Sequence, residues 1–166
     1  HALKKLGVQT GDRIATMALN HHWHFENIYA SACTGTISHP INIRLSLDHM
    51  VHTITHAEDK IIFFDEDIKP LVEAIYDRIK DSVDAFIYMS NKPGLPDTPI
   101  APLYSYEELI KNEPTTFDWP DLNEDTHAVL YYTTGTTGLP KGALFTHRQV
   151  YLQCTNTLMS IGMAVR

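Results

Sequence analysis

Short apolar runs alternate with amphipathic segments over the first part of the chain. The runs at residues 13–19, 60–65 and 84–90 have the length and composition of strands, and the last two are apolar enough to be buried on both faces of a sheet. The segments between them repeat apolar residues with the period of a helix. The predicted helices span residues 22–35, 47–59 and 68–80. This alternation predicts an α/β fold, with a mostly parallel sheet and helices on both faces.

Local signals mark the ends of these helices. Gly7 closes a short helix at the start of the chain, and Gly35 closes the next one. The third helix is amphipathic, and Ser46 is placed to cap its first turn. Its apolar face is formed by Leu47, Met50, Val51 and Ile54.

The second part of the chain is organised differently. Prolines recur every third residue within residues 90–120, where only residues 105–113 look helical, so a connector outside the core is predicted. A strand at 127–134 and a return strand at 142–146 follow. Thr146 and Gln149 then form a capping box for a final helix. The predicted inner stripe of this helix is Val150, Cys154, Leu158 and Ile161.

Composition and charge exclude some classes of function. With 43% hydrophobic and 20% charged residues the chain is typical of soluble globular proteins, and no run approaches the ~18 apolar residues of a membrane span. The formal charge of −7 disfavours nucleic acid as a partner. Cys33 and Cys154 lie outside any metal or redox spacing, so we expect buried core residues of a reduced, cytoplasmic protein. A start at His1 and a stop at Arg166 suggest a piece of a longer protein.

The strongest chemical signal is the segment YTTGTTGLPKG, which spans Tyr132 to Gly142. A loop after a buried strand of an open α/β sheet lies at the edge where ligands bind. Gly135 and Gly138 allow positive φ angles and a close approach of the backbone to a ligand. Amides, hydroxyls and one ammonium that converge from a loop suit a polyphosphate. The side-chain donors are Thr133, Thr134, Thr136, Thr137 and Lys141.

Two other interpretations of this segment explain less. A solvated turn between strands needs neither four hydroxyl residues nor a lysine. The nucleoside-triphosphate loop G-x-x-x-x-G-K-[ST] needs a Ser or Thr after its lysine, whereas Gly142 follows Lys141 and Pro140 precedes it. The next helix also begins late, near His147, so its N-terminus does not adjoin the loop. A phosphate loop of another kind is therefore predicted.

The segment resembles the YTSGTTG-x-PKG signature of the adenylate-forming superfamily, which includes acyl-CoA synthetases, luciferases and peptide-synthetase adenylation domains. Thr134 stands where serine is usual and keeps the hydroxyl. Other segments look like the fatty-acyl-CoA ligase branch, in order and spacing: LGVQTGDRIATMALN, INIRLSLDHMVHTITHAEDKIIFFDED, the stretch that starts with SYEELIKNE, and FTHRQ. The resemblance covers essentially the whole chain.

This resemblance implies a reaction in two halves. A carboxylate attacks the α-phosphate of MgATP to give an acyl-adenylate and pyrophosphate, and the CoA thiol then displaces AMP. The implied co-substrates are ATP, Mg²⁺ and CoA, with a small carboxylic acid as the further partner and a homo-oligomer left open. The loop would hold the β- and γ-phosphates through Thr133, Thr134, Gly135, Thr136, Thr137, Gly138 and Lys141.

The resemblance also implies that much of the active site lies elsewhere. Members of the family are far longer, and their adenine-binding segment, magnesium-binding glutamate and adenylation lysine would follow Arg166. Residues 1–166 are therefore expected to form part of the large N-terminal domain, without the C-terminal domain, and to be inactive alone. An aryl-acid ligase, a peptide-synthetase adenylation domain and a non-catalytic truncated module remain alternatives. No catalytic residue or metal ligand is assigned within the chain.

A histidine triplet on the third predicted helix invites a metal-site hypothesis. His49, His52 and His56 are spaced so that their imidazoles could share one side of the helix. They lie away from the apolar stripe, however, and no fourth ligand can be identified. We therefore expect all three side chains to be in solvent.

Two further polar clusters have simpler explanations. His21, His22 and His24 stand at the start of a predicted helix, without a serine, cysteine or carboxylate at a catalytic spacing, and are interpreted as a helix entrance. The acidic residues at 65–67 precede a helix, where they are expected to complement its dipole.

Overall fold

The structure is a computed structural model that describes residues 1–133 and 138–164. The strands are β1 (Arg13–Met17), β2 (Ile37–Pro40), β3 (Asp59–Asp65), β4 (Ala85–Met89), β5 (Leu103–Ser105), β6 (His127–Thr133) and β7 (Lys141–Thr146). The helices are α1 (Ala2–Lys5), α2 (His22–Cys33), α3 (Leu47–Ala57), the 3-10 helix η1 (Glu66–Ile68), α4 (Lys69–Ile79), α5 (Tyr106–Ile110) and α6 (His147–Ala164).

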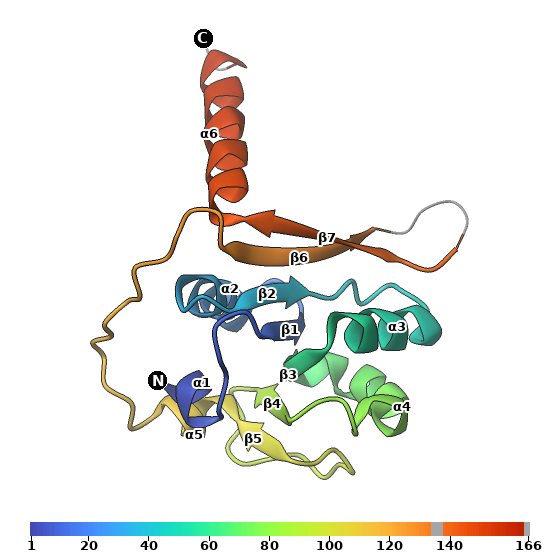
Figure 1. The fold of residues 1–166 in the computed structure, drawn as a ribbon. Helices are drawn as coiled ribbons and strands as arrows, with labels where there is room; N and C mark the ends of the chain where they lie inside the picture. The colour runs from blue at the N-terminus through green and yellow to red at the C-terminus, as the bar shows by residue number, and fades with distance from the viewer. Residues whose placement is uncertain (134–137, 165–166) are drawn as a thin grey trace.

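The strands form one seven-stranded sheet in the order β5-β4-β3-β1-β2-β6-β7 (Figure 1). All neighbouring strands are parallel except β6 and β7, which form an antiparallel hairpin. Strand β5 lies at one edge, and residues 111–126 then cross the molecule to reach β6 near the other edge (Figure 1). The predicted α/β fold with a mostly parallel sheet is confirmed.

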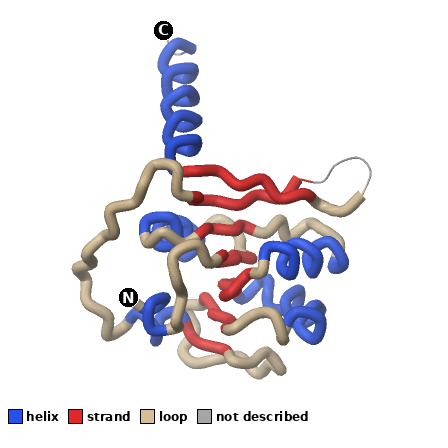
Figure 2. Tube along the Cα trace, in the orientation of Figure 1, coloured by secondary structure: helices blue, strands red, loops and turns tan. Residues whose placement is uncertain are grey.

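Helices cover both faces of the sheet, as predicted (Figure 2). On one face, α3 and α4 pack over side chains such as Ile62 and Phe64 of β3. On the other face, α1, α2 and α5 pack over Ile61 and Phe63 of the same strand. Because successive residues of a strand point to opposite faces, a strand covered on both sides must be apolar throughout. This requirement explains the unbroken apolar run that marks β3.

The predicted helix caps are also confirmed. The Ser46 hydroxyl accepts a hydrogen bond from the backbone N–H of His49 at 3.3 Å, as expected for a capping serine. The capping box before α6 closes in both directions: the N–H of Thr146 donates to Oε1 of Gln149 at 2.9 Å, and the N–H of Gln149 donates to Oγ1 of Thr146 at 3.2 Å. These short polar signals locate the start of both helices.

The prediction for residues 90–120 is partly wrong. The segment includes β5, which pairs in parallel with β4 and extends the sheet. Ile100 is only 3% exposed and packs into the core with α3 and α4. An edge strand of three residues within a proline-rich stretch is too short to show a period-two pattern, so the sequence does not reveal it.

The prediction of a buried stripe on α6 is wrong for the residues described. Val150 is 37% exposed, Leu158 70% and Ile161 56%. Helix α6 contacts β6 and β7 beside its N-terminal end and then projects away from the sheet, so no described segment covers it (Figure 1). Cys154 on this helix is exposed and Cys33 is half-buried, so the prediction of buried cysteines is wrong as well. Among the described residues, no helix is long and apolar enough to cross a membrane.

Candidate functional site

The loop between β6 and β7 lies at the carboxyl edge of the parallel strands. Strand β6 runs parallel to β2 and ends at Thr133, and Lys141 pairs with Thr133 at the start of β7. The hairpin therefore places the first and last predicted phosphate-binding residues opposite each other. Of the other residues predicted for the site, Gly138 is described and lies between them. Thr134, Gly135, Thr136 and Thr137 lie outside the described residues.

The described residues that are predicted to bind phosphate are open to a ligand. Thr133, Gly138 and Lys141 are all exposed. Gly138 has a φ of +122°, a conformation that residues with a Cβ rarely adopt, as the sequence predicted. The exposed hydroxyl and ammonium groups are therefore available to a ligand with several oxygen atoms.

A cavity of about 550 Å³ lies between the loop and helix α3. Its walls are formed by His52 and His56 of α3 and by residues 138–142. His52 Nε2 donates a hydrogen bond to the carbonyl oxygen of Pro140 at 3.1 Å. The His56 Nδ1 atom lies 2.6 Å from the hydroxyl of Tyr132. The ring centres of His52 and His56 are 5.3 Å apart. Helix α3 thus contacts the hairpin on both sides of the loop.

The prediction that all three histidines of α3 lie in solvent is wrong for His49 and His52, which are half-buried, whereas His56 is exposed but contacts Tyr132. A helical wheel separates the core face of α3 from the rest, but it cannot show that a hairpin 88 residues later in the chain packs against another face. His49 is half-buried, and no side-chain hydrogen bond joins it to a described residue. Within the described ranges, no group of three or more His, Cys, Asp or Glu side chains could hold a metal ion.

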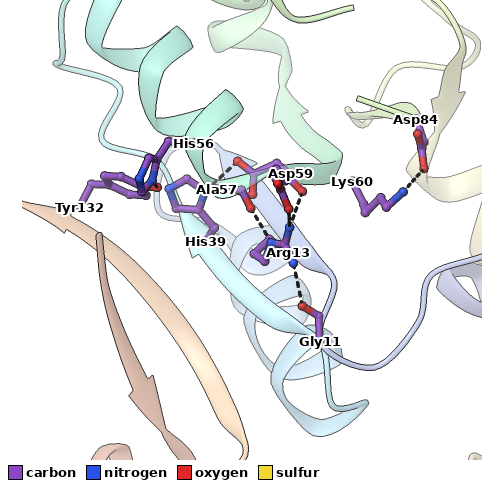
Figure 3. Close-up of polar contacts among 10 residues, drawn as sticks. Gly11, Arg13, His39, His56, Ala57, Asp59, Lys60, Asp84 and Tyr132 are labelled. Carbon is purple, nitrogen blue, oxygen red and sulfur yellow. Dashed lines mark hydrogen bonds and ion pairs between the residues drawn. The ribbon is translucent and has the colours of Figure 1, made fainter. Parts of the chain in front are cut away.

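A buried histidine–carboxylate pair lies behind Tyr132 (Figure 3). The Nδ1 atom of His39 lies 2.8 Å from Oδ2 and 3.0 Å from Oδ1 of Asp59, and their side chains are 1% and 0% exposed. The ring of Tyr132 packs 5.1 Å from that of His39. The pair thus connects β2 to β3 beneath the end of β6.

Sequence reasoning missed this pair. Asp59 was expected in the last turn of the helix at residues 47–59, but it is the first residue of β3. In the sequence, His39 is a polar residue in a short extended segment, and Asp59 is a polar residue directly before a buried strand. Neither position identifies the other residue as its partner. Buried polar groups require such a partner.

Charge and burial set the ionisation of this region. Burial raises the pKa of Asp59, while the hydrogen bond from His39 and the nearby Arg13 guanidinium oppose that rise. Shielding from solvent, reinforced by the charge of Asp59, raises the pKa of Tyr132 to about 12, although Arg13 acts in the opposite direction. Tyr132 therefore keeps its proton at neutral pH and can serve as a hydrogen-bond donor.

Arg13 connects β1 to the end of α3 (Figure 3). Its guanidinium donates to the backbone carbonyls of Gly11, Ala57 and Glu58, and it pairs with the Glu58 carboxylate at 2.8 Å. A cation at the C-terminus of a helix satisfies carbonyl groups that have no partner in the helix. Arg13 thus stabilises the end of α3 that carries His56.

The second histidine cluster forms a helix entrance, as predicted. His21 caps α2, and its Nδ1 accepts a hydrogen bond from the N–H of His24 at 3.4 Å. The ring also reaches Oδ2 of Asp65 at 2.9 Å. Asp65 caps η1, as expected for an acidic residue at a helix start, but it also accepts a hydrogen bond from the N–H of Leu19 at 2.7 Å. It therefore connects the ends of β1 and β3 as well.

Comparison with known proteins decides the family. Residues 1–165 match the family model described as AMP-binding enzyme. The chain belongs to the AMP-binding enzyme family.

Curated relatives of this member of the AMP-binding enzyme family include several CoA ligases. It is 43% identical over 165 residues to a 3-methylmercaptopropionyl-CoA ligase of Ruegeria lacuscaerulensis, covering 97% of this chain and 30% of the relative. It is 37% identical over 158 residues to a medium-chain-fatty-acid–CoA ligase of Ectopseudomonas oleovorans, covering 95% and 29%. It is 38% identical to a long-chain-fatty-acid–CoA ligase of Thermus thermophilus, covering 98% and 28%. The chain thus spans under a third of the length of these relatives.

Solved structures share the fold of this member of the AMP-binding enzyme family. The anthranilate CoA ligase AuaEII superposes with a TM-score of 0.79 at 22% identity, over 89% of this chain and 27% of that protein. A red-emitting luciferase from Phrixothrix hirtus superposes with a TM-score of 0.71 at 19% identity, over 89% and 36%. At these identities the likeness establishes the fold alone, and it confirms the predicted α/β architecture.

Proposed function

We propose that the protein is an ATP-dependent, AMP-forming ligase, or part of one, that joins a fatty acid or a related carboxylic acid to CoA. The match to the AMP-binding enzyme family over residues 1–165 carries this proposal. Support comes from the names of its relatives, which are CoA ligases at 37% to 43% identity. Residues 1–166 would form part of the large N-terminal domain of such an enzyme.

The loop between β6 and β7 is proposed to bind the β- and γ-phosphates of ATP. When the acid attacks the α-phosphate, the bond from that phosphorus to the bridging oxygen breaks, and negative charge develops on the departing pyrophosphate. Donors that are already in place stabilise this charge. We assign this role to Thr133, Gly138 and Lys141, and to the hydroxyls and amides of residues 134–137.

Magnesium is proposed to reach this site with the phosphates of ATP. Mg²⁺ prefers oxygen ligands, and it is usually held by phosphate oxygens, waters and one or two carboxylates. The described residues that line the loop cavity provide imidazole, ammonium and backbone groups, without a carboxylate. These residues fit a phosphate group better than a bare metal ion. A protein carboxylate for the ion would have to come from outside the cavity lining.

The acid substrate is proposed to be aliphatic. The relatives' names include 3-methylmercaptopropionyl, medium-chain and long-chain acyl groups, which differ in length but not in their aliphatic character. A 30% identical relative from Streptomyces coeruleorubidus is named as a fatty acid ligase for acyl-carrier protein, so a carrier thiol is the alternative acceptor to CoA. We also propose a cytoplasmic location, which two free cysteines support.

Isotope exchange between ATP and pyrophosphate tests the proposed function. The full-length protein that contains this chain would be assayed with aliphatic acids of rising length, an aryl acid and an amino acid. Exchange that requires an aliphatic acid is expected, and the 166-residue chain alone is expected to give none. Exchange only with the aryl acid or the amino acid would assign the protein to one of the two alternative classes. No exchange with any acid would favour a non-catalytic module. Sedimentation velocity on the same sample would separately measure the oligomeric state.

A further inference from the structure

One helix contacts both ends of the loop between β6 and β7. His52 and His56 lie one turn apart on α3. His56 is hydrogen-bonded to Tyr132, the residue before Thr133, and His52 to the carbonyl of Pro140, the residue before Lys141. Each contact is thus one residue away from a proposed phosphate-binding side chain.

We propose that His52 and His56 are positioning residues of the ligase, which fix Thr133 and Lys141 for phosphate binding through Tyr132 and Pro140. The inference rests on the proposed function of the loop. Neither imidazole is assigned a contact with the substrate. Their role is to hold the two ends of the loop at a set position relative to α3 and the sheet.

The hairpin needs such support because the sheet holds it weakly at this end. Strand β6 pairs with β2 at Val129, opposite Ser38, whereas Thr133 lies further along. Strand β7 is the edge of the sheet and contacts β6 on one side only. Isolated two-stranded hairpins are marginally stable in water. Side-chain contacts from α3 therefore add lateral support where the ladder to β2 provides little.

The support itself is connected to the core. The ring of Tyr132 lies 5.8 Å from that of His56 and 5.1 Å from that of the buried His39 (Figure 3). His39 is in turn fixed by Asp59 of β3. His52 and His56 are half-buried and exposed, respectively, so neither contributes much to the core. Their loss should change the position of the loop rather than the stability of the fold.

Catalysis by a loop of this kind depends on donors that need no rearrangement during the reaction. Small displacements of such groups reduce the rate even when the displaced residue is not itself removed. A positioning role therefore predicts a kinetic effect from residues that never contact ATP.

Kinetics on the full-length protein test the inference. His52→Leu and His56→Leu are each expected to raise the KM for ATP or lower the kcat of acid-dependent exchange, about tenfold in combined kcat/KM. His52→Gln keeps an N–H group that can donate to the carbonyl of Pro140, so it is expected to retain most of the activity. His49→Leu, on the same helix, is the matched control and should leave both parameters unchanged.

Amide hydrogen exchange on the same variants provides a readout that is independent of activity. The amides of Thr133 and Lys141 are expected to exchange roughly fivefold faster in both leucine variants, as for the loss of one ordinary hydrogen bond. Those of Ile14 and Ile62 in the core should not change. Unchanged exchange at the loop would overturn the inference, and so would faster exchange throughout the core, because the histidines would then be structural.

The two assays separate this inference from the proposed function. If the wild-type protein lacks acid-dependent exchange, the proposed function fails, and the hydrogen exchange of the loop alone decides whether the histidines position it. If the wild-type protein is active and both leucine variants keep its kcat and KM, the function stands and the positioning role is wrong.

Discussion

The hydroxyl of Tyr132 lies 2.6 Å from Nδ1 of His56 and thereby joins the end of β6 to helix α3 across 76 positions of sequence. The Tyr132 ring also packs 5.1 Å from that of His39, whose partner Asp59 lies in β3. Strand β6 is thus connected to the core beside the loop that we propose to bind phosphate.

Tyr132 is expected to ionise well above the ordinary range of tyrosine. Its pKa is raised from 10.0 to about 12, first by shielding from solvent and then by the charge of Asp59. Because the folded pKa lies above the unfolded one, the stabilisation that Tyr132 provides is complete below pH 10 and is lost as the pH rises through 12. The tyrosinate absorbance of the wild type minus that of Tyr132→Phe measures the midpoint. A midpoint at the ordinary pKa would show that Tyr132 is solvated.

Removing His39 should destabilise the chain strongly. His39→Ala leaves the Asp59 carboxylate buried without its partner, which typically costs about 3–5 kcal/mol in the free energy of unfolding. Asp59→Asn should cost less, since the amide oxygen can still accept a hydrogen bond from His39. Urea denaturation of both variants provides the comparison.

The exposed pair of Lys60 and Asp84 provides the control for this experiment (Figure 3). Asp84→Asn should leave the urea midpoint of unfolding unchanged, because exposed ion pairs contribute little. Equal midpoints for His39→Ala and Asp84→Asn would contradict the role assigned to the buried pair.

Alanine substitutions at Gly35 and Gly7 distinguish backbone strain from steric overlap. Both have positive φ angles, +83° and +80°, so alanine is strained at either position, by about 1–2 kcal/mol. A Cβ at Gly35 would also lie 3.0 Å from Cδ2 of Leu122, whereas none of the described atoms lies within 4 Å of one at Gly7. Gly35→Ala should therefore lower the free energy of unfolding by about 1 kcal/mol more than Gly7→Ala. Equal losses in thermal or urea unfolding would mean that Leu122 moves aside freely.

The helices α3 and α6 should respond differently to the loss of an apolar side chain. Ile54 of α3 is fully buried, so Ile54→Ala should cost about 2–5 kcal/mol of unfolding free energy. Leu158 of α6 is 70% exposed, so Leu158→Ala should change the free energy of unfolding by less than about 0.5 kcal/mol. Urea denaturation of the 166-residue chain makes the comparison. A large loss for Leu158→Ala would show that α6 packs against something in solution.

The sequence predicts the elements better than the contacts between distant elements. Strand β3 and helix α4 are visible because their periodicity is local, and Ser46 and Thr146 mark helix starts through their neighbours in sequence. The contacts of His39 with Asp59 and of His56 with Tyr132 join segments far apart in the chain, and no local pattern encodes them. The stripe on α6 is present as a pattern, but a pattern does not show whether a partner covers it.

The candidate site was predictable to the same extent. Glycines, hydroxyls and one lysine close together in the sequence indicated a phosphate loop. The hairpin pairs Thr133 with Lys141, so the two ends of this segment lie side by side. The supporting histidines were assigned to solvent, since amphipathicity identifies only the face that meets the core. Residues on one element that position a site on another can be recognised only from the structure.

Acid-dependent exchange between ATP and pyrophosphate in Lys141→Met tests the central claim most directly. The full-length protein with this substitution would be compared with the wild type and with Lys111→Met, which removes an exposed lysine of the α5 end. If the loop binds the phosphates, Lys141→Met should reduce the exchange rate roughly 10²- to 10³-fold, as for other preorganised donors, and Lys111→Met should not change it. Wild-type exchange in Lys141→Met would contradict the assignment of this loop.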